Sequence, residues 1–244
     1  MKKFCIVVPI YHEDIYDYEE ISIKRLHDVI YDKDYDVFFI YPENISIDKY
    51  LELYDKANCI SMNSEFFTDI KSYSQLLLNY NFYNMFSQYQ YMLIHQTDSY
   101  LFKDDIEYWC DKVYDYVGAP IMSASKVWEQ DNIDTWEPKV GNGGLSLRRI
   151  AIFKDITNPD GQFRQSFNIT PELLNDVINE DVYFCAFVKK YYLMHMPDWS
   201  EAAYLSLSIN PEELYKLIDT EPMGCHNFNL FKDFWKDHGI DELK

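Results

Sequence analysis

The sequence predicts an α/β protein with a mostly parallel central sheet. Short apolar, β-branched runs of strand length alternate with segments of helical periodicity, and a polar cluster directly follows one of the runs. A strand that is apolar at successive positions is buried on both faces, which is typical of parallel strands covered by helices. This alternation favours a Rossmann-type sandwich with helices on both faces of the sheet.

The first strand–helix–strand unit occupies the N-terminal part of the chain. Residues 4–9 and 37–41 are the expected strands, and Ile23, Leu26 and Ile30 recur between them at roughly helical spacing. Strands joined in this way lie parallel in one sheet. Further strands are expected at residues 59–60, 91–94 and 145–147, and further helices at residues 48–54, 73–86, 150–155, 171–178, 181–190 and 230–236.

The rest of the chain shows no sign of a second domain. Thr170 and Pro171 suit the cap and first turn of one expected helix. Residues 123–139 are polar and lack periodicity, so we expect a loop over the site, in which Trp128 and Trp136 touch an acceptor or pack. No repeat, low-complexity tract or linker is visible. Residues 1–244 are therefore predicted to form a single domain.

The charge of the chain excludes one class of partner. Against 22 Lys and Arg stand 41 Asp and Glu, which gives a net charge of −19. Nonspecific duplex binding needs a basic surface, so no nucleic-acid partner is expected. An anionic small substrate can still bind where a divalent cation bridges its phosphates. The 18% aromatic content suits a sugar or nucleotide cleft as well as a core.

The cysteines and the hydropathy indicate the compartment. The five cysteines are scattered without any CxxC pair, which predicts neither a zinc site nor a disulfide framework. Free thiols fit a reducing cytosol. No apolar run reaches the roughly 18 residues that a membrane span requires. We expect a cytoplasmic protein, either free or peripherally bound at the inner face of the membrane.

Two candidate sites follow or precede expected strands. Gln96, Thr97 and Asp98 come directly after the strand at residues 91–94, where open α/β sheets bind ligands. Asp98 could hold a divalent cation between two phosphates, or it could be an ordinary turn aspartate. Residues 141–144 include three glycines, which let the backbone approach a ligand or simply form a tight turn.

Basic residues follow the last expected strand. Arg148 and Arg149 could approach a phosphate, although a solvated helix start is the simpler interpretation.

Two further candidates lie in the second half of the chain. Glu180 and Asp181 precede an apolar helix, where backbone amides can orient a carboxylate for proton transfer or simply receive an N-cap. His226 follows Gly224 in a glycine turn and could complete a metal site alongside a carboxylate, or serve as a hydrogen-bonded structural residue. The other histidines show no paired spacing and are expected to be structural.

The order of these features resembles the glycosyltransferase-A superfamily. More closely, five segments are similar to a bacterial family of unknown function that is associated with surface-polysaccharide gene clusters. These segments are residues 91–99, 107–110, 116–120, 140–148 and 224–226. The similarity extends from the first strand to His226 and implies a glycosyltransferase-A-like domain. Residues 1–122 would then be the nucleotide-binding half and residues 123–244 the acceptor-binding half.

The resemblance implies a role for each candidate. Asp98 and His226 would ligate Mn²⁺ or Mg²⁺ bridging the donor diphosphate, Asp181 would deprotonate the acceptor, and Glu180 would belong to the same catalytic element. The donor nucleotide would be held by residues from the chain start, the metal motif and the glycine segment. They are Val8, Pro9, Tyr11, Gln96, Asp98, Gly143 and Gly144. Gln96 departs from the family's acidic first position, which puts metal affinity in question.

The predicted function is metal-dependent transfer of a sugar from a nucleotide-sugar donor to an acceptor hydroxyl. The acceptor would be a glycan, a lipid-linked glycan or a protein in surface glycan biosynthesis. The carboxylate pair at a helix start, together with a separate candidate metal site, favours a direct displacement that inverts the anomeric centre. A catalytically silent carbohydrate- or nucleotide-binding protein is an alternative, because Gln96 replaces an acid. A glycoside hydrolase with paired carboxylates is a second alternative.

Overall fold

The structure, a computed structural model, describes residues 2–121, 139–188 and 194–243. Its strands are β1 (Lys2–Pro9), β2 (Asp36–Pro42), β3 (Asn58–Met62), β4 (Tyr89–His95), β5 (Ser99–Leu101), β6 (Tyr116–Ile121), β7 (Lys139–Arg149), β8 (Ser206–Leu207) and β9 (Gly224–His226). The central sheet has the order β3-β2-β1-β4-β7-β6. The first four strands in this order run parallel, and β7 runs antiparallel between β4 and β6. The predicted mostly parallel α/β sheet is confirmed.

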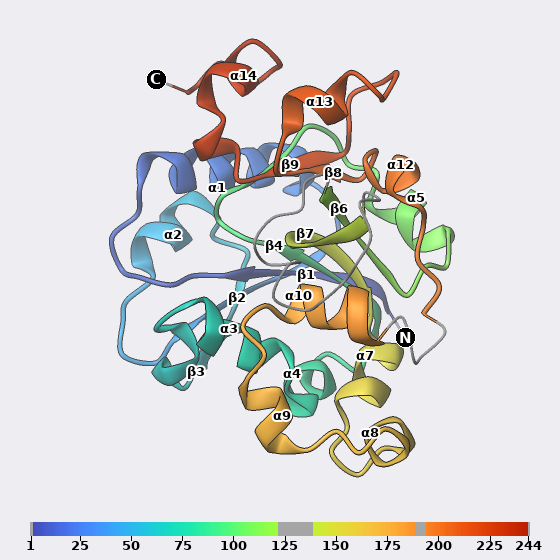
Figure 1. Ribbon diagram of the computed structural model, residues 1–244. Helices are drawn as coiled ribbons and strands as arrows, with labels where there is room; N and C mark the ends of the chain where they lie inside the picture. Colours follow the sequence, from blue (N-terminus) through green and yellow to red (C-terminus); the bar gives the residue numbers. More distant parts are fainter. Residues whose placement is uncertain (1, 122–138, 189–193, 244) are drawn as a thin grey trace.

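Helices cover both faces of this sheet. The α-helices are α1 (Asp17–Ile30), α2 (Asp48–Leu53), α3 (Ile70–Leu77), α4 (Tyr80–Met85), α5 (Ile106–Asp111), α7 (Ile150–Thr157), α8 (Gln162–Ser166), α9 (Pro171–Asn175), α10 (Glu180–Val182), α12 (Trp199–Ala202), α13 (Pro211–Tyr215) and α14 (Lys232–Lys236). Figure 1 shows α1 and α5 on one side of β1 and α3, α4 and α7 on the other. Among the described residues, no helix is both long enough and apolar enough to cross a bilayer.

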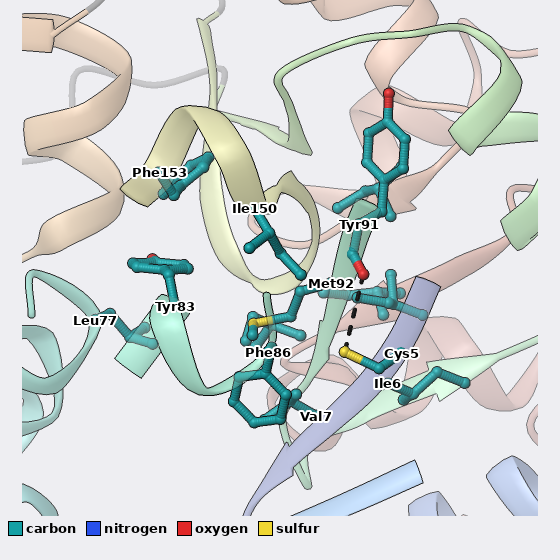
Figure 2. Close-up of a cluster of buried hydrophobic side chains, with 14 of the residues drawn as sticks. Cys5, Ile6, Val7, Leu77, Tyr83, Phe86, Tyr91, Met92, Ile150 and Phe153 are labelled. Atoms are coloured by element: carbon teal, nitrogen blue, oxygen red, sulfur yellow. Dashed lines mark hydrogen bonds between the residues drawn. The ribbon is translucent and has the colours of Figure 1, made fainter. Parts of the chain in front are cut away.

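The core between the layers explains why the first strands are apolar at successive positions. Ile6 and Val7 point to opposite faces of β1, and both are fully buried. Figure 2 shows them with residues of β4, α4 and α7 in one cluster. The thiol of Cys5 donates to the carbonyl oxygen of Tyr91 at 3.8 Å. Cys5 is therefore a buried packing residue, as free cysteines usually are.

The helix expected at residues 73–86 is in fact two helices. The chain leaves α3 at Leu78, and Asn79 starts α4 by accepting a hydrogen bond from the amide of Asn81 at 2.9 Å. A side chain that caps the next helix competes with continuation of the previous one. The expected cap at Thr170 is confirmed, because its hydroxyl accepts from the amide of Leu173 at 3.3 Å.

The glycine segment is part of a strand rather than a turn before one. β7 includes Gly143 and Gly144, and it pairs with β4 through Leu145, Ser146 and Leu147. On its other side, β7 has three more residues than β6 between two neighbouring pairs, so the glycines lie in a bulge. The expectation of a separate glycine turn was therefore wrong.

A second, smaller sheet has the order β5-β9-β8 and joins β5 to two strands of the C-terminal part. Its own apolar cluster includes Tyr100, Leu207, Phe228 and Trp235. The 3₁₀ helices η1 (Ser64–Phe67) and η3 (Phe228–Leu230) and the π-helix η2 (Tyr183–Val188) complete the elements. The expected helix at residues 181–190 is thus α10 followed by η2, with its end outside the described residues.

The expected loop at residues 123–139, with Trp128 and Trp136, also falls outside the described residues except for its last residue. Lys139 is the first residue of β7.

Candidate active site

Gln96, Thr97 and Asp98 lie at the carboxyl end of β4, as the sequence predicts. The amide of Gln96 donates to the carbonyl oxygen of Gly144 at 2.9 Å, which ties this segment to β7. The hydroxyl of Thr97 donates to the carboxylate of Glu19 at 2.7 Å. Glu19 comes from the first turn of α1 and is almost fully buried. The segment is therefore held from both sides before any ligand is present.

Strand pairing brings His226 to Asp98. Ser99 of β5 is paired with His226 of β9, so the residue before β5 lies beside the imidazole. His226 Nε2 is 3.0 Å from Asp98 Oδ1 and 3.1 Å from Gln96 Oε1. Burial alone would raise the pKa of Asp98, but the charge and hydrogen bond of His226 outweigh it and lower that pKa. Asp98 is therefore an anion at neutral pH.

The three side chains suit a divalent cation. Ligands at about 2.1 Å from an octahedral ion are separated by about 3.0 Å when they are adjacent. The separations of His226 Nε2 from Asp98 and from Gln96 match this spacing. Among the described residues, however, no three His, Cys, Asp or Glu side chains are placed so that they could hold one metal ion together. Gln96 contributes a neutral amide oxygen, so such an ion would gain less charge compensation than from two acids.

The other nitrogen of His226 is held in place. Nδ1 is 3.2 Å from the hydroxyl of Ser208 and 3.0 Å from the side-chain amide of Asn227. The side-chain NH2 of Asn227 donates to Nδ1, so the ring proton of a neutral His226 lies on Nε2, between the acceptors Asp98 and Gln96. A cation bound at Nε2 would take the place of that proton.

Gly143 and Gly144 lie between this cluster and Asp181. A Cβ on Gly144 would stand 2.1 Å from His226 Nε2, so only glycine lets the ring pack on this strand. The amide of Gly143 donates to Asp181 Oδ2 at 3.0 Å. Gly144 thus contacts His226 of the candidate cation site, and the adjacent Gly143 contacts the carboxylate of Asp181.

Asp181 is a carboxylate with a perturbed protonation equilibrium. It accepts hydrogen bonds from the amides of Gly143 and Val182, at 3.0 and 2.7 Å. Burial, and then the neighbouring charge of Glu180, raise the pKa of Asp181 to about 7. The two amides and Arg148 oppose this rise. A carboxyl group with a pKa near the operating pH can both accept and release a proton.

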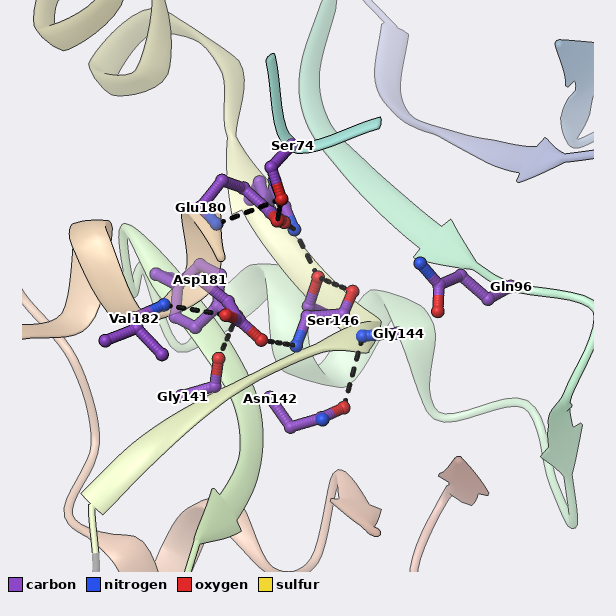
Figure 3. A network of polar contacts seen from close by, with 12 residues as sticks. Ser74, Gln96, Gly141, Asn142, Gly144, Ser146, Glu180, Asp181 and Val182 are labelled. Carbon is purple, nitrogen blue, oxygen red and sulfur yellow. Dashed lines mark hydrogen bonds and ion pairs between the residues drawn. The ribbon is translucent and has the colours of Figure 1, made fainter. Parts of the chain in front are cut away.

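Glu180 is oriented away from this role by a buried ion pair. Its Oε1 lies 2.9 Å from Nη2 of Arg148, and its Oε2 accepts from the hydroxyl of Ser74 at 3.0 Å. Figure 3 shows this network around Ser74 and Glu180, next to Asp181 and the glycine strand. Arg148 also donates to Tyr83 at 3.0 Å. The two carboxylates that are adjacent in sequence therefore have different partners.

Neither interpretation of the two arginines holds for Arg148. It is fully buried rather than solvated, and it binds Glu180 rather than facing an open phosphate site. Arg149 is half-exposed and pairs with Asp115 at 3.4 Å. Alternation along β7 explains the difference, because consecutive side chains of a strand point to opposite faces.

The end of β1 contributes to the same region. Val8 and Pro9 are both buried, and Pro9 ends the strand. Tyr11 lies beyond them, and its hydroxyl accepts from Gln96 Nε2 at 3.3 Å. The structure thus brings the predicted donor-binding residues of β1, β4 and β7 together.

Two residues of the site have roles that the sequence did not predict. Glu19 is one of several acids in the first turn of α1, and only the fold shows that it is buried against Thr97, Tyr50 and Tyr16. Arg148 could have been suspected from its place in an otherwise apolar strand, since a buried arginine needs a carboxylate partner.

Residues 56–226 match the family described as "Protein of unknown function (DUF5672)". The chain belongs to this family. The DUF5672 match includes the metal-candidate segment after β4, the glycine strand, Asp181 and His226. No curated protein matches the chain.

Solved structures show the fold of this DUF5672 chain. The apo form of mouse xyloside xylosyltransferase 1 is 10% identical and has a TM-score of 0.58, covering 92% of this chain and 96% of that one. An active-site mutant of LgtC is 13% identical with a TM-score of 0.61, covering 91% and 86%. The galactosyltransferase LgtC with donor and acceptor sugar analogues is 11% identical with a TM-score of 0.54, covering 91% and 86%. The fold is that of glycosyltransferase-A enzymes, which confirms the predicted resemblance.

Proposed function

We propose that the chain is a glycosyltransferase that uses a divalent cation and a nucleotide-sugar donor. The observation that carries this proposal is the contact of Gly143 with Asp181 and of Gly144 with His226. The candidate proton acceptor, Asp181, and the candidate cation ligand, His226, thus contact two adjacent glycines of β7. The glycosyltransferase-A fold supports the same activity.

The donor would bind across the ends of β1, β4 and β7. Asp98 and His226, with Gln96 beside them, would hold Mn²⁺ or Mg²⁺, which when bound neutralises charge on the donor diphosphate. Tyr11 would contact the nucleotide together with the backbone of Val8 and Pro9. These residues converge on one edge of the sheet, where α/β folds bind nucleotides.

The proposed reaction is a direct displacement. The acceptor hydroxyl oxygen forms a bond to the anomeric carbon, and the bond from that carbon to the diphosphate oxygen breaks. The electron pair leaves with the diphosphate, and the hydroxyl proton moves to the carboxylate of Asp181. Attack from the face opposite the leaving group inverts the anomeric centre. Glu180 acts as a positioning residue, because Arg148 and Ser74 hold it.

The acceptor would be a hydroxyl of a glycan, a lipid-linked glycan or a protein in surface glycan biosynthesis. Such acceptors would place the enzyme in the cytoplasm or peripherally at the inner face of the membrane.

The decisive variant is Asp181→Asn. Asparagine keeps the shape of the side chain but cannot accept the proton, so we expect transfer to fall by about 10²–10⁴-fold. Binding of the nucleotide sugar, measured by calorimetry with Mn²⁺, should change less than about threefold. Normal turnover of the variant with a correct donor and acceptor would remove Asp181 from the mechanism.

A catalytically silent binding protein is the second candidate, favoured by the neutral Gln96. It predicts nucleotide-sugar binding without product for any acceptor. The hydrolase alternative predicts free sugar when the donor is incubated without an acceptor. Product analysis with and without acceptor therefore separates all three functions.

A further inference from the structure

A cavity lies away from the candidate active site, between α3, α4, α7, α8 and α9. Its volume is about 240 Å³, and none of Gln96, Asp98, Asp181 and His226 lines it. Cavities for drug-sized ligands have about 300–1,000 Å³, so this one suits a single molecule of monosaccharide size. Figure 1 shows these helices together below the sheet.

Polar groups line much of this cavity. The polar side chains include Gln75, Asn79, Asn81, Thr157, Arg164 and Asn175. Gln75, Asn79 and Thr157 already form hydrogen bonds within the protein. The side-chain amides of Asn81 and Asn175 can donate and accept hydrogen bonds, which matches the hydroxyl groups of a sugar. Leu78, Leu174 and Pro171 provide apolar contacts beside them. Asn81 and Asn175 are exposed, so the cavity opens at the surface.

Arg164 is the one cation among the residues that line the cavity. Its Nε is buried and has no hydrogen-bond partner in the described part of the chain, and its Nη2 reaches only the carbonyl oxygen of Leu78, at 3.4 Å. The other arginines are better satisfied. Arg148 and Arg149 pair with carboxylates, and Arg25 donates to two carbonyl oxygens at 2.7 and 2.5 Å.

Within the part of the chain that the structure describes, Arg25 and Arg164 both lack a carboxylate partner, and Arg164 also lacks the two short backbone hydrogen bonds of Arg25. Within the described residues, Arg164 forms no ion pair, although acids outnumber bases almost two to one. Arg164 is partly buried, and the unused donor is its buried Nε, which is costly unless a ligand or water satisfies it. Its planar donor fork fits a carboxylate or phosphate.

We propose that this cavity binds a monosaccharide-sized ligand that carries a carboxylate or phosphate group. Arg164 pairs with the anion, and the side-chain amides bind the hydroxyl groups. The inference does not depend on the proposed transferase activity, because it concerns different residues and requires only binding.

The test is calorimetric titration of the full chain in EDTA, which keeps divalent ions from holding phosphate at the active site. The probes are glucuronate, glucose 6-phosphate, glucose and inorganic phosphate. We expect at least one of the two anionic sugars to bind, and glucose and inorganic phosphate to bind at least tenfold more weakly. The two anionic sugars tell a carboxylate ligand from a phosphate ligand.

Two variants locate the binding. Arg164→Gln should weaken binding of the anionic sugar at least tenfold, because hydrogen bonds to a charged group are lost. Asn81→Trp should also abolish it by filling the cavity mouth, and an exposed position tolerates this change even if Arg164→Gln does not fold. Lys24→Gln removes one positive charge from an exposed position of α1 and should change nothing.

Three results would overturn the proposal. They are no binding of either anionic sugar, equal binding of glucose or phosphate, and binding that survives Asn81→Trp.

Discussion

At the scale of single residues, the protonation of Asp181 links stability to pH. Its pKa in the folded chain is raised to about 7, whereas an unfolded aspartate has a pKa of about 3.9. Between these values the folded state keeps the proton and the unfolded state has lost it. Stability therefore falls as pH rises from about 4 to about 7 and is constant beyond that range with respect to this group.

The substitution Asp181→Asn removes this pH-dependent contribution to the free energy of unfolding. We expect the variant to gain stability over the natural chain at pH 8, on the order of a few kcal/mol, and to gain little at pH 4. Urea unfolding of both proteins at the two pH values measures the difference, in which titrating groups that do not interact with Asp181 cancel. A stability difference that is the same at pH 4 and pH 8 would contradict the raised pKa.

At the scale of elements, β7 is the strand on which the site is built. It is paired on both sides, and its bulge places Gly143 and Gly144 between α10 and β9. A bulge re-aims the backbone at the cost of some ladder hydrogen bonds. Glycine is required at these two positions because Asp181 and His226 pack directly against the backbone.

Gly144→Ala tests this packing. The new Cβ would overlap the imidazole of His226, so we expect a loss of about 1–3 kcal/mol in stability and a Mn²⁺ affinity at least tenfold lower. Gly161→Ala is the matched control, because a Cβ there also meets tight contacts but far from His226. The control should lose stability only. Unchanged Mn²⁺ affinity in Gly144→Ala would show that His226 does not hold the ion.

The ion pair between β7 and α10 is the second element-scale feature. Arg148→Met leaves Glu180 buried without its partner, which we expect to cost about 3–5 kcal/mol. Adding Glu180→Gln should recover part of this loss, because the uncompensated charge is gone. Arg149→Met is the control at a half-exposed pair and should cost about 1 kcal/mol or less. Denaturant unfolding of the natural chain, Arg148→Met, Glu180→Gln and the double variant gives the coupling, and strictly additive effects would exclude a buried pair.

At the scale of the whole molecule, the net charge of −19 opposes binding of a nucleotide diphosphate without a cation. We expect the correct nucleotide sugar with Mn²⁺ to raise the melting temperature by about 5–10 °C at a hundredfold excess over Kd. EDTA should remove most of this shift, as should His226→Ala. A shift of equal size in EDTA would show that the donor binds without a divalent ion.

The sequence by itself determined the class of fold and the position of most of its elements. Apolar runs such as residues 4–9 become buried when the chain folds. Only a few architectures are compatible with their alternation with helical segments. The carboxyl end of β4 was predictable for the same reason, because ligand sites in such sheets follow the strand ends. Local patterns were therefore enough to identify Asp98 and Asp181 as candidate site residues.

Only the tertiary structure decided which of these residues act together. His226 meets Asp98 because β5 pairs with β9, and the two strands are more than a hundred residues apart. Glu180 and Asp181 received different partners because successive residues at the start of α10 face different neighbours, Arg148 on one side and Gly143 on the other. Burial and long-range pairing depend on the whole fold, and no local pattern in the chain records them.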